Sequence, residues 1–414
     1  MKTQLYIVCS FFILLIFCPE LRGQEVYSMD DLLFSRSENT NALDPAIGLN
    51  EKINLKPVGL LEKLEFRTNS DEWDLERQQY TLRLSPNDFK SPKTIRAIQD
   101  LQLRSLEFIG SGREDEILFS RYQIISDYYF AVEELKIREK ENTLLADEKT
   151  VLEYKAESEA DVDIDGLLDN RLEKEKNDIR IESLKRKQAL AISTLRGTEE
   201  ASGVLDVSNL ITIEKIRRRV TSWADGIIQG YDLDRQSLEI EERMLEVQKE
   251  KEVGRKIIDF VQLRYRGDND LNIGREISFG VGLNIPVPSS NSRRKNEALI
   301  DLEQEKMQHQ QIKQEQQKEV LSILAELEES FFEFDSYNAI LSKDLFSNSL
   351  KAMQVDGPGD IKASLSIQLA ENRLKKEILD LQEDILNGYL DLAFKKGLIY
   401  QRPKFNFIDN SLAY

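Results

Sequence analysis

The chain has 414 residues, and 57 Lys and Arg against 75 Asp and Glu give it a formal net charge of −18. A surface this acidic argues against nucleic acid and anionic membrane surfaces as partners, because both are themselves negatively charged. Two cysteines and one histidine leave too few residues for a zinc site or a Ser-His or Cys-His triad. No group of residues in the sequence predicts catalysis or a cofactor.

Residues 1–23 are predicted to be a secretory signal peptide. Lys2 precedes an apolar stretch from Leu5 to Phe17, and Leu21-Arg-Gly23 offers an imperfect small-residue cleavage site. The apolar stretch of ~13 residues is too short for a spanning helix, and a retained anchor is the alternative.

Both cysteines, Cys9 and Cys18, lie in this leader, so the mature chain is expected to have neither disulfides nor thiol chemistry. Cys18 raises a lipoprotein site as a second alternative, but bulky Phe17 stands where a small residue is expected. His309 lies in a Gln-rich helical stretch and is interpreted as a solvated helix residue. No later segment approaches the ~18 consecutive apolar residues of a spanning helix, so any membrane-crossing part must be made of strands.

A first structural repeat is predicted over residues 24–202. It contains a short helical signal at Met29 to Phe34, a hairpin at 57–90 and a helical hairpin at 91–197. Gly110-Ser-Gly112 marks a potential kink in the first long helix.

A second structural repeat is predicted over residues 203–400. It contains short helices within 204–255, one of them over Val204 to Val220, followed by a hairpin at 257–287 and a helical hairpin at 289–396. A C-terminal tail covers 401–414.

The sequence also repeats itself in detail. Asp169-Asn-Arg-Leu-Glu-Lys-Glu reappears as Glu371-Asn-Arg-Leu-Lys-Lys-Glu, and the helices that follow are predicted to end at Gly197 and Gly397. A duplicated unit of strand hairpin and helical hairpin predicts the architecture of the whole fold.

The two strand hairpins alternate apolar and polar residues with a period of two. This pattern fits transmembrane strands with lipid on one side and water on the other, or a soluble sheet packed on a helix. Four strands are too few to close a barrel, so the membrane interpretation requires several copies of the chain. The alternating apolar residues are Leu64, Phe66, Tyr80, Leu82, Leu84, Val261, Leu263, Tyr265, Ile277, Phe279, Val281, Leu283 and Ile285.

The second helical hairpin shows a coiled-coil rhythm of four and three residues. Its first helix contains neither Gly nor Pro up to Val355, which is too long for one globular core to surround, so it must pair along its length. We expect antiparallel partners with buried stripes. The stripes are Val320, Leu324, Leu327, Phe331, Phe334, Leu341 and Leu345 on one helix, and Leu374, Ile378, Leu381, Ile385 and Leu392 on the other.

The order of these elements resembles the TolC-like outer-membrane efflux family over residues 28–400. Gly280-Val-Gly-Leu-Asn-Ile-Pro286, with Arg293-Arg and Glu297-Ala-Leu after it, is similar to the family's second strand entering its long helix. Asp44-Pro-Ala-Ile47 resembles the family's Asn-Pro near the N-terminus. Asp165-Gly-Leu-Leu-Asp169 and Leu369-Ala-Glu-Asn-Arg-Leu374 stand where the family's return helices begin.

The resemblance implies a mainly α fold with a small membrane β-barrel portion: a duplicated β-hairpin plus a long antiparallel α-helical hairpin, assembled as a trimeric α/β barrel channel. It implies a homotrimer in the outer membrane of a Gram-negative-type bacterium, with a periplasmic extension. The partners implied are membrane lipid, a periplasmic adaptor and an inner-membrane transporter, with no nucleic acid, cofactor or catalysis. Arg67 and Arg83 in the first hairpin depart from the family pattern.

The two helical corners are the candidate working ends. Asp161, Asp163 and Asp165 form one corner, where a capped helix start, a docking or gating role, and an incomplete calcium loop are the alternatives. Asp356 and Asp360 flank Gly-Pro-Gly at the other, where a ring of carboxylates favouring cations competes with a solvated turn.

Three arginines are the candidate residues of the barrel lumen, because they occupy the polar positions of the strands: Arg67, Arg83 and Arg264. The function predicted is therefore a trimeric exit duct for efflux or secretion. A periplasmic coiled-coil adaptor or scaffold is the alternative, although adaptors have one helical hairpin where this chain has two. An exported enzyme is a third class without a site to support it.

Overall fold

The computed structural model describes residues 26–34, 61–70, 78–86, 91–158, 164–197, 203–224, 226, 230–253, 257–266, 277–283, 288–343, 346, 349, 361–400 and 404–410. Contacts divide the chain into two compact units. The helical unit comprises Met1–Leu43, Asp115–Ile227 and Val320–Tyr414, and the sheet unit comprises Asp44–Glu114 and Ile228–Glu319. Each unit draws on both predicted repeats, whose boundaries stay a prediction.

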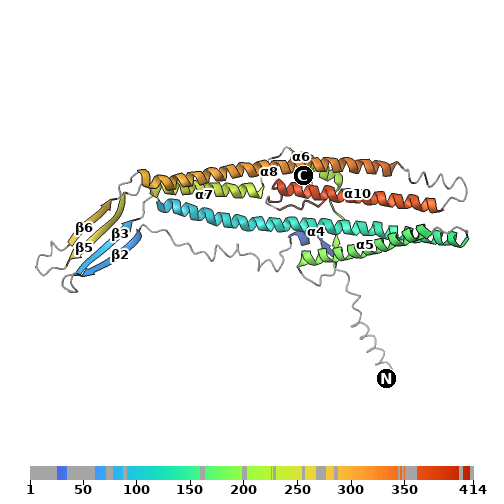
Figure 1. Ribbon diagram of the computed structural model, residues 1–414, viewed down its shortest axis with the longest axis horizontal. Helices are drawn as coiled ribbons and strands as arrows, with labels where there is room; N and C mark the ends of the chain where they lie inside the picture. Colours follow the sequence, from blue (N-terminus) through green and yellow to red (C-terminus); the bar gives the residue numbers. More distant parts are fainter. Residues whose placement is uncertain are drawn as a thin grey trace, which may run out of the picture. The chain divides into compact units, whose positions relative to one another are not determined.

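The sheet unit contains both predicted strand hairpins. Its strands are β2 (Leu61–Ser70), β3 (Gln78–Pro86), β5 (Ile258–Arg266) and β6 (Ile277–Leu283). They form one antiparallel sheet in the order β2-β3-β5-β6, so the two hairpins meet through their inner strands (Figure 1). Residues 177 to 187 positions apart in the sequence are therefore direct neighbours in the sheet.

Helix α7 (Tyr231–Val253) packs on the first part of α4 (Ser91–Ser158) within the sheet unit. The rings of Phe108 and Tyr231 stack with centroids 4.9 Å apart, and Thr94 Oγ1 donates to a Glu252 carboxylate oxygen at 2.6 Å. A Cβ atom on Gly112 would overlap the Tyr231 ring. Gly112 therefore permits this close approach. Helix α4 is continuous through this position, and the potential kink stays a prediction.

The helical unit holds the remaining helices: the second part of α4, α5 (Ile164–Arg196), the second part of α8 (Pro288–Ser342) and α10 (Ile361–Lys395), together with the short α2 (Met29–Phe34) and α6 (Ile213–Ala224). Most of the predicted extension of α8 to Val355 lies outside the described residues. Within the described part of the chain, no helix is both long enough and apolar enough to cross a membrane.

One short strand, paired in parallel with another, replaces part of a predicted helix in this unit. β4 (Val204–Asp206) pairs with β1 (Val26–Ser28), and α6 begins only at Ile213. The expectation of a helix from Val204 to Val220 was therefore wrong at its first turns. Backbone pairing with a segment almost 180 residues earlier outweighs local helical preference, and no local pattern contains that information.

The predicted helix ends at Gly197 and Gly397 are confirmed. Both residues have positive φ, 68° and 74°, which glycine adopts without the steric cost that a Cβ atom would add. The Leu398 amide donates to the Ala393 carbonyl oxygen at 2.9 Å, and the Gly397 amide donates to that of Phe394 at 2.9 Å. These bonds satisfy the last carbonyls of α10 in a Schellman-like end.

The C-terminal residues 404–410 join the core of the helical unit. The Tyr122 hydroxyl donates to the Phe405 carbonyl oxygen at 2.6 Å, and Arg219 donates to that of Phe407 at 2.9 Å. The Asn406 side chain donates to Asp30 in α2 at 2.6 Å. Residues from both ends of the chain are thus held in one hydrogen-bonded core.

The predicted apolar stripes are largely buried. Leu327 on α8 is 2% exposed, and its Cδ2 atom lies 3.0 Å from where a Cβ on Gly388 of α10 would stand. Ile378, Leu381, Ile385 and Leu392 on α10 are buried as well. These positions agree with the coiled-coil spacing, whereas Leu345 lies outside the described residues.

Leu327→Ala is expected to lower the free energy of unfolding by about 2–5 kcal/mol, because it opens a cavity between α8 and α10. The matched change Glu328→Ala, at the exposed neighbour, should be nearly silent. The urea or thermal midpoint of purified protein measures both. Equal effects of the two variants would contradict the burial of Leu327.

Candidate functional site: a two-faced sheet and a polar seam between helices

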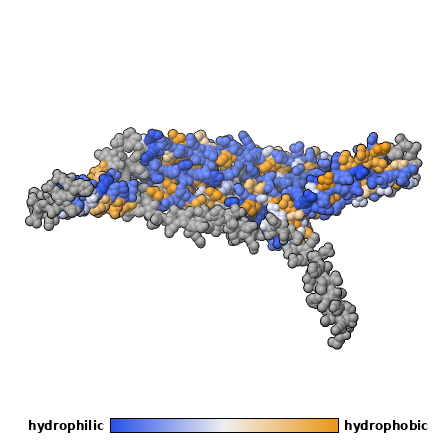
Figure 2. All heavy atoms as spheres, turned by 60° about the horizontal axis from the view of Figure 1, so that its bottom comes forward, coloured by the Kyte–Doolittle hydropathy of each residue, from blue (hydrophilic) through white to orange (hydrophobic). Residues whose placement is uncertain are grey.

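The sheet has one face made of apolar side chains. The strand register places Phe66, Leu82, Leu263 and Phe279 side by side in one row across all four strands. The next row contains Leu64, Leu84, Val261 and Val281. The face is open in the single chain, since Phe66 is 64% exposed and Phe279 is 69% exposed. Figure 2 shows hydrophobic side chains gathered over part of the sheet, at the left-hand end of the view.

Two register shifts keep this face apolar to its edge. Leu61 pairs with Pro86 after a shift at Lys63, and Ile258 pairs with Leu283 after a shift before Phe260. Each shift inserts one residue. Strict alternation would place Leu61 and Ile258 on the polar face, and the inserted residue returns both to the apolar face.

The opposite face is polar and carries the three predicted arginines. Arg67 and Arg264 share a row with Thr81 and Ser278, and Arg83 shares the next row with Glu65, Gln262 and Gly280. The register therefore brings all three arginines to one face. Their location inside a pore stays a prediction.

Arg83 is the most constrained of these arginines. Its guanidinium carbon lies 3.5 Å from the centre of the Phe260 ring, and one of its nitrogens lies 3.5 Å from a carboxylate oxygen of Asp259. The Phe260 ring itself occupies the space above Gly282, where any Cβ atom would overlap it. Gly282 thus makes room for the ring on which Arg83 stacks.

The outer strands of the sheet, β2 and β6, each have one unpaired edge among the described residues. Edge backbone groups pair readily with another chain, and proteins normally cover or charge such edges. Here both edges flank an exposed apolar face, so within the described part of the chain edge backbone groups and apolar area are left unsatisfied at the same place.

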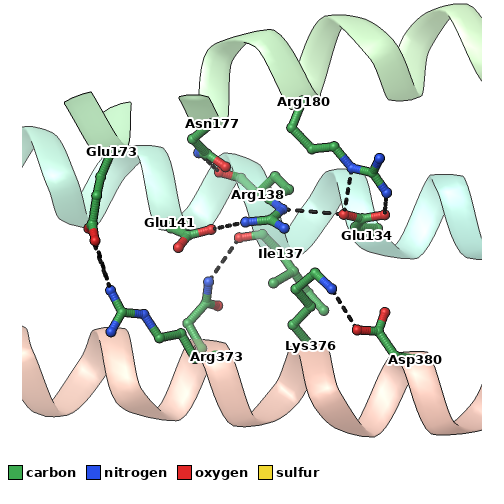
Figure 3. A network of polar contacts seen from close by, with 11 residues as sticks. Glu134, Ile137, Arg138, Glu141, Glu173, Asn177, Arg180, Arg373, Lys376 and Asp380 are labelled. Atoms are coloured by element: carbon green, nitrogen blue, oxygen red, sulfur yellow. Dashed lines mark hydrogen bonds and ion pairs between the residues drawn. The ribbon is translucent and has the colours of Figure 1, made fainter. Parts of the chain in front are cut away.

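The helical unit contains a polar seam between α4, α5 and α10 (Figure 3). Glu134 on α4 receives hydrogen bonds from Arg180 on α5 at 2.8 and 3.0 Å and from Arg138 at 3.3 Å. Arg138 also donates to Glu141 at 2.8 Å. On the other side of the seam, Arg373 on α10 reaches Glu173 on α5 at 3.4 Å.

Buried asparagines attach both flanking helices to the backbone of α4. The side-chain nitrogens of Asn170 and Asn177 on α5 donate to the carbonyl oxygens of Leu145 and Arg138, at 3.0 and 2.8 Å. Asn372 on α10 donates to that of Ile137 at 3.0 Å. Asn170 and Asn372 are 3% and 2% exposed, and they occupy equivalent positions of the repeated sequence motif. The duplication has therefore placed the same bond on two sides of α4.

The carboxylates along this seam differ in pKa. Burial opposes ionisation of Glu134, but the hydrogen bonds and charge of Arg180, with Lys376 and Arg138, outweigh it and lower its pKa. Burial raises the pKa of Glu383 on α10, where Asp127, Asp380 and Asp384 oppose the charge of Lys187. Burial likewise raises the pKa of Asp384, and also that of Asp391, which lies farther along α10 near Glu326 of α8.

Of the five predicted corner residues, the structure describes Asp165. Asp161, Asp163, Asp356 and Asp360 lie outside the described residues. Asp165 is exposed in the first turn of α5, where a carboxylate suits the helix N-terminus. Among the described residues, no cluster of three His, Cys, Asp or Glu side chains has the arrangement of a metal site.

Solved structures of outer-membrane channels share this architecture. The chain matches the CmeC outer membrane channel of Campylobacter jejuni with a TM-score of 0.61 and 12% identity, over 93% of this chain and 86% of that one. It matches the open state of the MtrE outer membrane channel of Neisseria gonorrhoeae with a TM-score of 0.59 and 11% identity, over 89% and 88%. It matches the outer membrane protein VceC of Vibrio cholerae with a TM-score of 0.60 and 10% identity, over 89% of this chain and 95% of that one.

The chain has the TolC-like fold. Neither protein-family models nor curated protein sequences give a match, so the similarity is one of structure. The structures it resembles are channels. The strand hairpins and long helices predicted from the sequence are confirmed. The predicted duplication is consistent with the TolC-like fold.

Neutralising Glu134 and Glu383 should have opposite effects on stability. Glu134→Gln is expected to cost about 1–3 kcal/mol at pH 7, because Arg180 and Arg138 lose a charged acceptor. The folded-state pKa of Glu134 is lowered, so its contribution is present above the unfolded pKa of ~4.3 and is lost as the pH falls through the folded value.

Glu383→Gln is expected to stabilise the protein at pH 7, because the folded state disfavours the ionised side chain. The raised pKa means that this gain fades as the pH falls through the folded pKa and the wild-type side chain becomes protonated. Thermal midpoints of both variants between pH 4 and 7 provide the measurement. A destabilising Glu383→Gln at pH 7 would contradict the environment described for Glu383.

Proposed function

We propose that this protein is an exit duct in the outer membrane of a Gram-negative-type bacterium, used in efflux or secretion. The observation that carries the proposal is the sheet with an exposed apolar face and two open edges. Lipid is the environment that satisfies such a face, and closure with further copies is the arrangement that satisfies such edges.

Closure requires that β6 of one copy pair with β2 of the next. The chain direction reverses at each step from β2 to β3, β5 and β6, so this new pair is antiparallel like the others. Three copies make a closed sheet of twelve strands, and the TolC-like fold favours this homotrimer. The strands have seven to ten residues, close to the ~9–11 residues of tilted transmembrane strands.

The polar face then lines the lumen and carries Arg67, Arg83 and Arg264. The long helices α4, α5, α8 and α10 supply the wall of a periplasmic extension. A periplasmic adaptor and an inner-membrane transporter are the proposed partners, meeting the helical corners that contain Asp161, Asp163 and Asp165 on one side and Asp356 and Asp360 on the other. The role is one of transport, without catalysis or a cofactor.

Phe279→Arg is expected to reduce the amount of assembled protein in the outer membrane, because an arginine facing lipid near the midplane costs about 2–4 kcal/mol. Ser278→Arg, on the polar face of the same strand, is the matched control and should assemble nearly normally. Ser278 is a cleaner control than Gly280, whose Cβ would stand 2.9 Å from the Gln262 side chain. Equal losses for the two variants would favour a sheet buried on both faces in a soluble protein.

A disulfide scan tests closure directly. Phe66→Cys in β2 is combined with a cysteine at position 277, 279, 281 or 283 of β6, in a chain whose Cys9 and Cys18 are replaced by Ala. Within one chain β2 and β6 are three strand spacings apart, ~14 Å, which is too far for a disulfide. Any cross-link must therefore join two copies.

The expected result is a ladder of covalent dimer and trimer for one of the four pairs, in protein extracted from the outer-membrane fraction. Without oxidant, the unheated sample should migrate as a large species that dissociates to a monomer on heating. Absence of cross-links for all four pairs, together with recovery of the protein in the soluble periplasm, would reject the proposed function.

A further inference from the structure

The polar face of the sheet is cationic although the chain is acidic. Its rows carry five cationic side chains against the single carboxylate of Glu65, in a chain with a formal net charge of −18. The cationic residues are Lys63, Arg67, Arg83, Arg264 and Arg266. Such an accumulation is the reverse of what the composition leads one to expect.

The charges are also segregated along the strands. The other two carboxylates of the strands, Glu62 and Asp259, lie at the two register shifts, at the end of the sheet away from the hairpin turns. Arg83 is paired with Asp259 at that end. Arg67, Arg264 and Arg266 lie toward the turns, where the described strands carry no other acid than Glu65.

Arg67 and Arg264 stand in one row, separated by β3 alone, and Arg266 stands in the next row. Two strand spacings put the backbones of Arg67 and Arg264 ~10 Å apart, and two residues along β5 put Arg266 ~7 Å from Arg264. Glu65 accepts from Arg67 at 2.8 Å and also contacts Lys63. Among the described residues, neither Arg264 nor Arg266 has an ion-pair partner.

We propose that Arg67, Arg264 and Arg266 form an anion-attracting ring in the lumen, which favours solutes bearing carboxylate or phosphate groups. This inference rests on the proposed function, because only closure of the sheet places nine such guanidinium groups around one opening. A guanidinium binds carboxylate and phosphate through two parallel hydrogen bonds, which a monovalent halide cannot match. The low-dielectric wall of a pore strengthens the field that such a ring produces.

The connecting segments 71–77 and 267–276 are acidic in sequence. The absolute ion selectivity of the whole pore therefore combines several charges, and the contribution of the ring has to be measured as a difference between variants. Salt of low concentration is needed, because the screening length is ~10 Å at 0.1 M, similar to the spacing of the arginines.

Purified trimer in a planar bilayer under a KCl gradient provides the test. Arg67→Gln/Arg264→Gln should lower the chloride-to-potassium permeability ratio by at least about twofold and weaken block by added citrate. Arg67→Lys/Arg264→Lys is the matched control, which keeps the charge and should keep the permeability ratio while binding citrate less well. Thr81→Glu is a second, independent variant that leaves both arginines in place, inserts a carboxylate between them, and should lower the ratio as well.

The anion-attracting ring would be overturned if Arg67→Gln/Arg264→Gln and Thr81→Glu both kept the wild-type permeability ratio and the wild-type block by citrate. That result would leave the proposed exit duct intact. Absence of any conductance from the correctly folded wild-type protein would instead count against the duct itself. The two failures are therefore distinguishable in one experiment.

Discussion

The four-stranded sheet, with its exposed apolar face and with two edges that no described strand pairs, is the constraint on which the rest of the protein depends. Hydrogen bonds across β2, β3, β5 and β6 fix the register, and the register decides which side chains share a face. A slip of one residue would mix Phe66 and Phe279 with arginines and remove the distinction between the faces. The two shifts at Leu61 and Ile258 show how closely that distinction is kept, because each restores the apolar face where simple alternation would lose it.

The helical unit is held by a different kind of constraint. Apolar stripes supply most of the buried area, but stripes of leucine and isoleucine permit sliding by a heptad. Asn170, Asn177 and Asn372 bond to named carbonyl oxygens of α4, and each leaves its own side-chain oxygen buried without a partner among the described residues. A shift along α4 would cost these bonds as well. Polar groups inside a coiled coil are known to specify register at some expense of stability.

Much of this fold could be predicted from the sequence, because its signals are periodic and repeated. Alternation marked the strands, the heptad spacing marked Leu327 and Ile385, and Gly197 and Gly397 marked helix ends that positive φ confirms. The strand pairing of Val204–Asp206 with Val26–Ser28 could not be predicted, since neither segment carries a local strand signal. The contact that Gly112 permits could not be predicted either, because it is made with Tyr231, more than a hundred residues away. The asparagines of the repeated motif were visible as a repeat, yet nothing in their spacing indicates that their acceptors are carbonyls of α4.

The mixing of the two repeats within each compact unit has a consequence for how the protein is made. The sheet joins residues near position 80 to residues near position 265, and the helical core joins Asp30 to Asn406. Contacts of such large sequence separation form slowly, because closing a long loop costs conformational entropy before the contact contributes. Neither half of the duplicated sequence can complete a core before the other half has been synthesised. The two predicted repeats therefore contribute jointly to both compact units, and a truncated chain carrying one repeat alone would lack part of each core.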